Sequence, residues 1–296
     1  PLANVPPVYF AAQGGLLDVV PDPRFTDNRL IYLSFAEGTA DDNGTAVARA
    51  RLGADGLEDV AVIFRNFSRK DTPVHYGGRL AFLPDGSLLL TTGDGFDYRE
   101  AAQDLSSGLG KVLRMNDDGT PAAGNPFDES PYVYSYGHRN PQGMDLEPAT
   151  GLLWESEHGP RGGDEINLVE KGLNYGWPVI TYGMNYNGTP ITEETHREGM
   201  EQPKLHWTPS IAVAGIDFYE GDAFPNWTGK LLAGGMASEE LHLLMIEDSE
   251  VTADEVILKG RGRIRDVASG PDGNIYLLLN DGTPRVGRVV RMVPAD

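Results

Sequence analysis

Histidines are the first residues of this chain whose chemistry could support proton transfer. His75 lies in the segment VHYGGRL, between an expected turn and an expected strand, and the two glycines after it allow close backbone approach. Because the unperturbed pKa of histidine lies near neutrality, His75 is a candidate general base, with an ordinary loop histidine as the alternative. His138 and His158 lack a second histidine at metal-ligand spacing, so the sequence argues against a zinc site.

Arginines form a second group, with Arg139 beside Asn140 and Arg263 two residues before Arg265. Residues two apart in a strand share a face, so we expect Arg263 and Arg265 to point together. Two like charges side by side are unfavourable unless an anion lies between them, which Asp266 or a ligand could provide. Arg139 and Asn140 supply a cation and an amide suited to the carboxylates or carbonyls of a ligand.

Oxygen-bearing groups for a metal gather in the segment HGPRGGDEINL. Gly159 and Pro160 could offer two successive backbone carbonyls, and Asp164 and Glu165 could offer carboxylates. Calcium binds oxygen ligands of both kinds in flexible geometry, so the segment is a candidate calcium site. A solvated acidic turn is the alternative.

The composition limits the classes of partner. The chain has 296 residues and a formal net charge of -20, from 24 basic and 44 acidic side chains, so it has no basic stripe to neutralise phosphates. We therefore expect neither nucleic acid nor an anionic membrane surface as a partner. Cysteine is absent, and no apolar run approaches the roughly 20 residues of a membrane span. The sequence starts at Pro1 with neither a signal segment nor an initiator Met, so we expect a processed or trimmed chain.

Repeated hairpins are the elements that must position these side chains. Residues 81–95 (AFLPDGSLLLTTGDG) and 267–282 (VASGPDGNIYLLLNDG) each read as a strand, a Pro-Asp-Gly turn and a second strand that ends at Asp-Gly. Looser copies of this pattern occupy residues 17–35, 144–155 and 216–233. Each copy precedes a further alternating run, at residues 45–52, 109–115, 165–169, 241–246 or 286–293.

Five repeats of about four short strands predict an all-β fold, and within that class a β-propeller, with a β-sandwich as the alternative. Only sixteen residues precede the first hairpin, so either the ring has five blades or its first blade is missing from this chain. Two long segments, Gly95–Asn125 and Thr181–Leu205, interrupt the repeat. Long loops on one face of a rigid scaffold usually shape a binding site, as we expect here.

Three longer motifs carry a family resemblance: GHRNPQG (137–143), SEHGPRGGDEINLVEKGLNYGWP (156–178) and RIRDV (263–267). In this order they resemble the soluble quinoprotein glucose/sorbosone dehydrogenases, and the aldose sugar dehydrogenase branch is most similar. The resemblance implies a six-bladed β-propeller that binds pyrroloquinoline quinone (PQQ) with Ca²⁺ and oxidises the C1 hydroxyl of aldoses to lactones. It also implies a periplasmic or secreted protein, and one propeller domain over residues 1–296 that lacks the first blade.

By the same resemblance, Gln13 would contact the quinone and His75 would take the proton from the sugar C1 hydroxyl. Arg139, with Asn140 beside it, would polarise the quinone carbonyl that receives the hydride. Arg263 and Arg265 would pair with carboxylates of the cofactor.

The resemblance also assigns two calcium sites. Gly159 and Pro160 would hold the catalytic Ca²⁺ through their carbonyl oxygens. Glu165, together with the carbonyl of Tyr175, would hold a second, structural Ca²⁺.

Two positions depart from the glucose-specific members of the family. Val74 stands where they have an aspartate, which leaves His75 without that carboxylate neighbour, and no lysine occurs near Gly235–Ser238. Both departures favour the broader aldose branch. The alternatives are a Ca²⁺-dependent lactonase on a similar propeller and a non-catalytic propeller that binds a protein or glycan. The sequence names neither the electron acceptor nor the oligomeric state.

Overall fold

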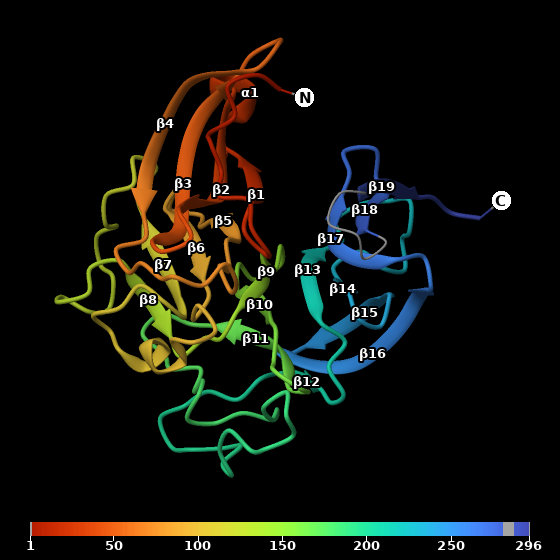
Figure 1. Ribbon diagram of the computed structural model, residues 1–296. Helices are drawn as coiled ribbons and strands as arrows, with labels where there is room; N and C mark the ends of the chain where they lie inside the picture. Colours follow the sequence, from red (N-terminus) through yellow and green to blue (C-terminus); the bar gives the residue numbers. More distant parts are fainter. Residues whose placement is uncertain (1, 281–286, 296) are drawn as a thin grey trace. The chain divides into compact units, whose positions relative to one another are not determined.

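The computed structural model describes residues 2–280 and 287–295, and within them the chain is all-β apart from two short helices (Figure 1). The chain divides into two compact units. Unit 1 comprises Pro1–Pro141, Glu170–Pro178 and Gly199–Glu201, and unit 2 comprises Gln142–Val169, Val179–Glu198 and Gln202–Asp296. A membrane-spanning helix is not found among the described residues, because both helices are too short.

Unit 1 holds two antiparallel sheets of four strands each. The first has the order β1 (Leu16–Pro21), β2 (Leu30–Gly38), β3 (Asn43–Leu52) and β4 (Leu57–Arg65). The second has the order β5 (Leu80–Phe82), β6 (Leu88–Thr92), β7 (Lys111–Met115) and β8 (Val133–Tyr136). Helix α1 (Phe25–Asn28) joins β1 to β2, and the 3-10 helix η1 (Arg99–Gln103) lies between β6 and β7.

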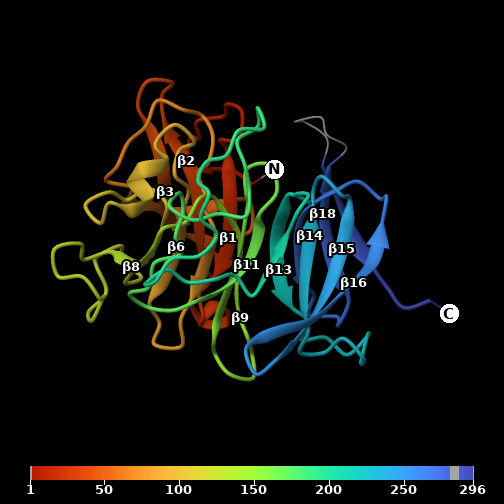
Figure 2. The same cartoon turned by 90° about the horizontal axis from the view of Figure 1, so that it is seen from below.

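Unit 2 holds the other three sheets of the described residues, and Figure 2 shows β14, β15 and β16 side by side in one of them. The first contains β9 (Pro141–Leu146), β10 (Leu153–Glu157), β11 (Asp164–Val169) and β12 (Leu205–Trp207). The second contains β13 (Val213–Phe218), β14 (Leu231–Gly235), β15 (Glu240–Glu247) and β16 (Glu250–Lys259). The third contains β17 (Arg263–Ser269), β18 (Ile275–Asn280) and β19 (Gly287–Met292).

The Pro-Asp-Gly segments form the predicted turns. In the β5–β6 hairpin, Gly86 has φ +85° and its N–H donates to the Leu83 carbonyl at 2.9 Å. In the β17–β18 hairpin, Gly273 has φ +74° and donates to the Gly270 carbonyl at 3.0 Å. Glycine adopts this left-handed conformation without steric cost, so the turn chemistry sets the register of both hairpins.

The predicted repeat and fold class are confirmed. Each hairpin pattern supplies the first two strands of a sheet, and each alternating run supplies the third. The five sheets are five blades of the β-propeller type, and four of them gain a fourth strand from β4, β8, β12 or β16. The ends of two predicted segments, at residues 281–282 and Val286, lie outside the described residues.

Apolar side chains between neighbouring sheets form the core of each unit. In unit 1, Tyr32 and Val47 of the first sheet pack with Leu88, Leu90 and Leu113 of the second, all fully buried. In unit 2, one cluster joins the β9–β12 sheet to the β13–β16 sheet, and another joins that sheet to β17–β19. Burial of both faces explains why these strands are so rich in leucine and valine.

Aspartates add a polar link between the first strands of neighbouring sheets. Asp18 of β1 accepts a bond at 2.9 Å from the backbone N–H of Leu80 in β5. In unit 2, Asp145 of β9 accepts from Phe218 N–H at 2.7 Å, and Asp217 of β13 accepts from Ser269 N–H at 2.9 Å. In each case the aspartate side chain accepts a hydrogen bond from a backbone N–H that no paired strand would satisfy.

Candidate functional site

His75 lies in the loop between β4 and β5, in a backbone conformation that is rare for histidine. Its φ is +52°, in the left-handed region, and its side chain is only about 6% exposed. The His75 backbone N–H donates to Oε1 of Gln13 at 2.9 Å, which fixes the loop to the segment before β1. Strained non-glycine residues of this kind concentrate at functional sites.

A buried carboxylate orients the His75 ring. Nδ1 of His75 lies 2.7 Å from Oδ1 of Asp94, which lies two residues after the end of β6. Asp94 also accepts from the Trp177 indole Nε1 at 2.8 Å, through Oδ2, and from the Phe96 backbone N–H at 2.8 Å. A carboxylate only accepts hydrogen bonds, so His75 carries its proton on Nδ1 and keeps the lone pair on Nε2. That tautomer is the one a general base needs.

Burial and nearby charges keep the His75 ring neutral and the Asp94 carboxylate ionised. Burial lowers the pKa of His75 most, and the charges of Arg139 and Lys70 lower it further, against the opposing effect of Asp94. Burial alone would raise the pKa of Asp94, but the hydrogen bond and charge of His75 and the charge of Arg139 hold it below its usual range. At neutral pH the ring is therefore neutral and the carboxylate is ionised.

Arg139 and Asn140 approach the same place from the loop between β8 and β9. The Arg139 guanidinium carbon lies 5.2 Å from the Trp177 ring centre, and the Arg139 carbonyl accepts from Asp94 N–H at 2.8 Å. Oδ1 of Asn140 accepts from the Gly77 N–H at 3.2 Å. Both side chains are buried. Unit 1 thus brings Gln13, His75, Arg139 and Asn140 together, as a site requires.

The Gly159–Pro160 segment of unit 2 forms a tight loop between β10 and β11. A Cβ on Gly159 would lie 2.2 Å from the Gly163 carbonyl oxygen and 2.3 Å from that of Gly162, so only glycine fits. Asp164, suggested by the sequence as a ligand, instead accepts from Gly159 N–H at 2.9 Å and from Val213 N–H at 3.2 Å. Asp164 therefore shapes the loop in which the carbonyls of Gly162 and Gly163 lie close to Gly159.

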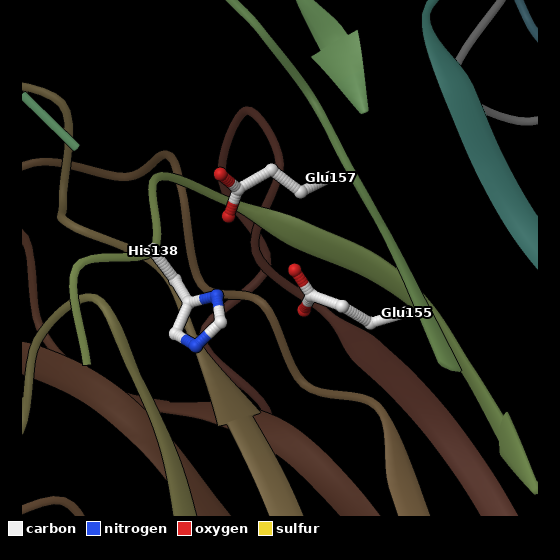
Figure 3. Close-up of side chains that lie close together, drawn as sticks. All are labelled: His138, Glu155 and Glu157. Carbon is white, nitrogen blue, oxygen red and sulfur yellow. The ribbon is translucent and has the colours of Figure 1, made fainter. Parts of the chain in front are cut away.

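Buried acid groups line one face of the β10–β11 strand pair. Glu155 and Glu157 leave β10 on the same side (Figure 3), opposite Asn167 and Glu165 of β11. All four residues are buried, and the Asn167 amide donates to Glu155 and to Glu165, each at 3.3 Å. Like charges directly opposite each other are unfavourable, so this face is suited to a cation.

Tyr175, predicted as a partner of Glu165, belongs to unit 1. Its ring stacks on His138, also labelled in Figure 3, with ring centres 4.6 Å apart. The His138 Nε2 lies 2.8 Å from Oγ of Ser135.

Arg263 and Arg265 flank the buried Ile264 on β17. The strand bulges between Ile264 and Asp266, so the simple alternation assumed for the strand breaks at Arg265. Partial burial, and then the charge of Arg263, lower the pKa of Arg265, so the two guanidinium groups are close enough to repel each other. An anion between them would relieve this repulsion.

The comparisons with known proteins agree with the resemblance. The sequence model described as Glucose / Sorbosone dehydrogenase matches residues 1–290. The chain belongs to the glucose/sorbosone dehydrogenase family. It is 43% identical over 307 residues to the aldose sugar dehydrogenase YliI of Escherichia coli strain K12, across 100% of this chain and 81% of that protein.

Solved structures extend this likeness to the fold of the family. A glucose dehydrogenase crystal structure aligns with a TM-score of 0.94 and 43% identity, over 100% of this chain and 87% of that one. The PQQ-bound aldose sugar dehydrogenase of Streptomyces coelicolor aligns with a TM-score of 0.79 and 31% identity, over 98% of this chain and 83% of that one.

Sequence reasoning missed the carboxylate beside His75. With Val74 in place of aspartate, His75 has no acid at the preceding position, but Asp94 supplies one from the loop after β6. In the sequence, Asp94 stands out only as part of the Asp-Gly pair that ends a predicted hairpin. Trp177 belongs to the GWP end of a family motif. Glu155 and Glu157 lie two residues apart in the segment WESE, a spacing that places them on one face of a strand.

Proposed function

We propose that this chain oxidises the C1 hydroxyl of aldose sugars to lactones, with PQQ as the hydride acceptor and with bound Ca²⁺. The buried His75–Asp94 pair, with Arg139 and Asn140 around it, is the observation that carries the proposal. Family membership and the PQQ-bound relative from Streptomyces coelicolor support the choice of cofactor. We place the protein in the periplasm or outside the cell, with an electron acceptor separate from this chain.

The cationic groups fit an anionic cofactor. PQQ carries carboxylates, and a chain with a net charge of -20 can hold them only through local cations. Arg263 and Arg265 would pair with those carboxylates, since an anion relieves the repulsion between the two guanidinium groups. Gln13 and Arg139 would contact the quinone.

The oxygen-rich segments fit calcium. Gly159 and Pro160 would hold the catalytic Ca²⁺ through their carbonyls, since calcium accepts backbone carbonyl oxygens as ligands. Glu165, with the Tyr175 carbonyl, would hold a structural Ca²⁺. The acid groups that share the face of Glu165 add negative charge for such an ion.

The tautomer of His75 decides which ring nitrogen accepts the proton. Nε2 takes the proton of the C1 hydroxyl, and the resulting imidazolium is stabilised by the Asp94 carboxylate on Nδ1. When bound, PQQ supplies a quinone carbonyl carbon that accepts the hydride from C1, and Ca²⁺ supplies a Lewis acid. Arg139, held over the Trp177 ring, adds positive charge beside the base and keeps it neutral before reaction.

Phe96 offers an apolar surface for the sugar. Its ring lies edge-on to His75, with ring centres 5.2 Å apart, and the residue is 43% exposed. Its φ of +72° is strained for a side chain of this size. A strained, exposed aromatic beside the base suits the C–H face of a pyranose.

Reconstitution tests the function directly. Metal-free protein is assayed with several aldoses and a dye acceptor, before and after addition of PQQ and Ca²⁺. We expect turnover only when both are present, and none from the His75→Ala protein under the same conditions. Absence of turnover, with no PQQ absorbance retained after desalting, would reject the proposal.

A further inference from the structure

A buried lysine lies beneath the His75 loop. Lys70 is 3% exposed, and its Nζ donates to the Thr72 carbonyl at 2.5 Å, to the Val74 carbonyl at 2.8 Å and to Oδ1 of Asn43 at 3.2 Å. The same nitrogen lies 3.5 Å from the centre of the Tyr76 ring. A buried lysine is costly, so its partners must compensate for the loss of water.

The contacts identify the charged form of Lys70. Burial lowers its pKa to about 7, and the charge of Asp94 opposes this effect. An ammonium has three N–H donors, one for each of the three acceptors that surround the Lys70 Nζ. The face of the Tyr76 ring also favours a cation. These contacts favour the ammonium form, which predominates below the Lys70 pKa of about 7.

Lys70 contacts both segments that form the candidate base. The carbonyls of Thr72 and Val74 belong to the loop that holds His75 at its positive φ. On the other segment, a Cβ on Gly95 would lie only 2.8 Å from the Lys70 Cδ, so the lysine stem packs directly under the residue after Asp94. Oγ1 of Thr72 donates to the Gly95 carbonyl at 2.6 Å and ties the segments together.

We propose that Lys70 is a positioning residue for sugar oxidation, which holds the His75 loop against the Asp94 segment and whose charge keeps His75 in the neutral form. This inference rests on the proposed function only for its effect on turnover. Its effect on the His75 ring is a property of the protein without cofactor or metal.

Two variants and a matched control separate charge from packing. Lys70→Gln removes the charge but keeps hydrogen-bond donors, and Lys70→Arg keeps the charge. Lys111→Gln is the control, because Lys111 is also fully buried and donates to three backbone carbonyls, of Ala101, Ala102 and Leu109, at 2.7 to 3.0 Å. Thermal unfolding midpoints show whether Lys70→Gln and Lys111→Gln destabilise the chain similarly.

The first measurement is an NMR titration of the histidine ring protons in the cofactor-free protein. The chain has six histidines, and loss of one resonance in His75→Gln assigns the relevant one. Removing a nearby positive charge favours the protonated ring, so Lys70→Gln should raise the pKa of His75 by about half a unit or more. Lys70→Arg and Lys111→Gln should leave it within about 0.2 units of the wild type.

The second measurement is the pH dependence of kcat/KM after addition of PQQ and Ca²⁺. Lys70→Gln should move the acidic limb to higher pH and lower kcat about tenfold or more at pH 7. An unmoved His75 titration in Lys70→Gln, or an equal shift in Lys70→Arg, would overturn the inference. Wild-type protein without turnover would reject the proposed function, whereas a shifted titration in that same protein would still support the charge effect of Lys70.

Discussion

Replacing Asp94 by asparagine gives the sharpest test of the site. Oδ1 of Asp94 accepts from His75 Nδ1 and from Phe96 N–H, and Oδ2 accepts from Trp177 Nε1. An asparagine oxygen would remain at the Oδ1 position, where it serves two donors. Its amide would then face the indole N–H, and a buried donor without an acceptor costs about 1–3 kcal/mol of stability.

Loss of the negative charge affects the reaction more than it affects stability. An opposite charge at hydrogen-bond distance stabilises the protonated ring by about 1–3 pKa units, and each unit is a factor of ten. If the proton is largely transferred in the transition state, Asp94→Asn should lower kcat about 10- to 1000-fold. Asp94 raises the pKa of His75 through its hydrogen bond and its charge, so loss of the charge moves the acidic limb to lower pH.

The assay is the dye-coupled rate between pH 5 and 9, with PQQ binding measured separately by absorbance titration. Asp254→Asn is the matched control, because Asp254 accepts from His242 Nδ1 at 2.6 Å and from Trp207 Nε1 at 2.9 Å in unit 2. Both variants should lose similar stability, but only Asp94→Asn should lose turnover. A kcat within about threefold of wild type, or an acidic limb at higher pH, would refute the assignment.

Four further predictions follow from the site. His75→Ala should lower kcat at least about 100-fold with little change in the PQQ Kd, and surviving turnover would show that another group takes the proton. Arg263→Ala should weaken PQQ binding about tenfold, whereas the exposed Arg288→Ala should not; equal affinities would contradict the anchor role. Calcium removal by a chelator should abolish turnover and lower the unfolding midpoint by several degrees, both restored by Ca²⁺, and no change in either would argue against resident calcium. Phe96→Ala should raise the aldose KM about tenfold with kcat nearly unchanged, with Phe67→Ala as control, and an unaltered KM would remove Phe96 from the sugar site.

Local chemistry explains why the fold was predictable from the sequence. Gly86 and Gly273 occupy turn positions that favour glycine, and the strands beside them alternate or run apolar as burial requires. These signals act over a few residues, so no knowledge of the tertiary structure is needed to interpret them. The family resemblance then predicts His75, Arg139 and Asn140 as residues of one site.

Non-local pairing explains what the sequence could not predict. Asp94 lies 19 residues from His75, and Trp177 lies 83 residues from Asp94, so their hydrogen bonds depend on which loops meet. The burial of Lys70 follows from the same loop packing. At Arg265, one extra residue in β17 breaks the period of two, and nothing in RIRDV marks that bulge.

Folding of unit 2 is coupled to proton binding by Asp145 and Asp217, the two aspartates that link its sheets. Burial, the largest effect, raises the pKa of Asp145 to about 6 and that of Asp217 to about 7. Between the usual carboxyl pKa and these values the folded chain holds protons that the unfolded chain releases, so these links lose stability as pH rises through this window. The pKa of Asp94 in unit 1 is lowered, so its contribution is lost as pH falls. Acidification therefore strengthens the Asp145 and Asp217 links of unit 2 while it weakens the contacts of Asp94 in unit 1.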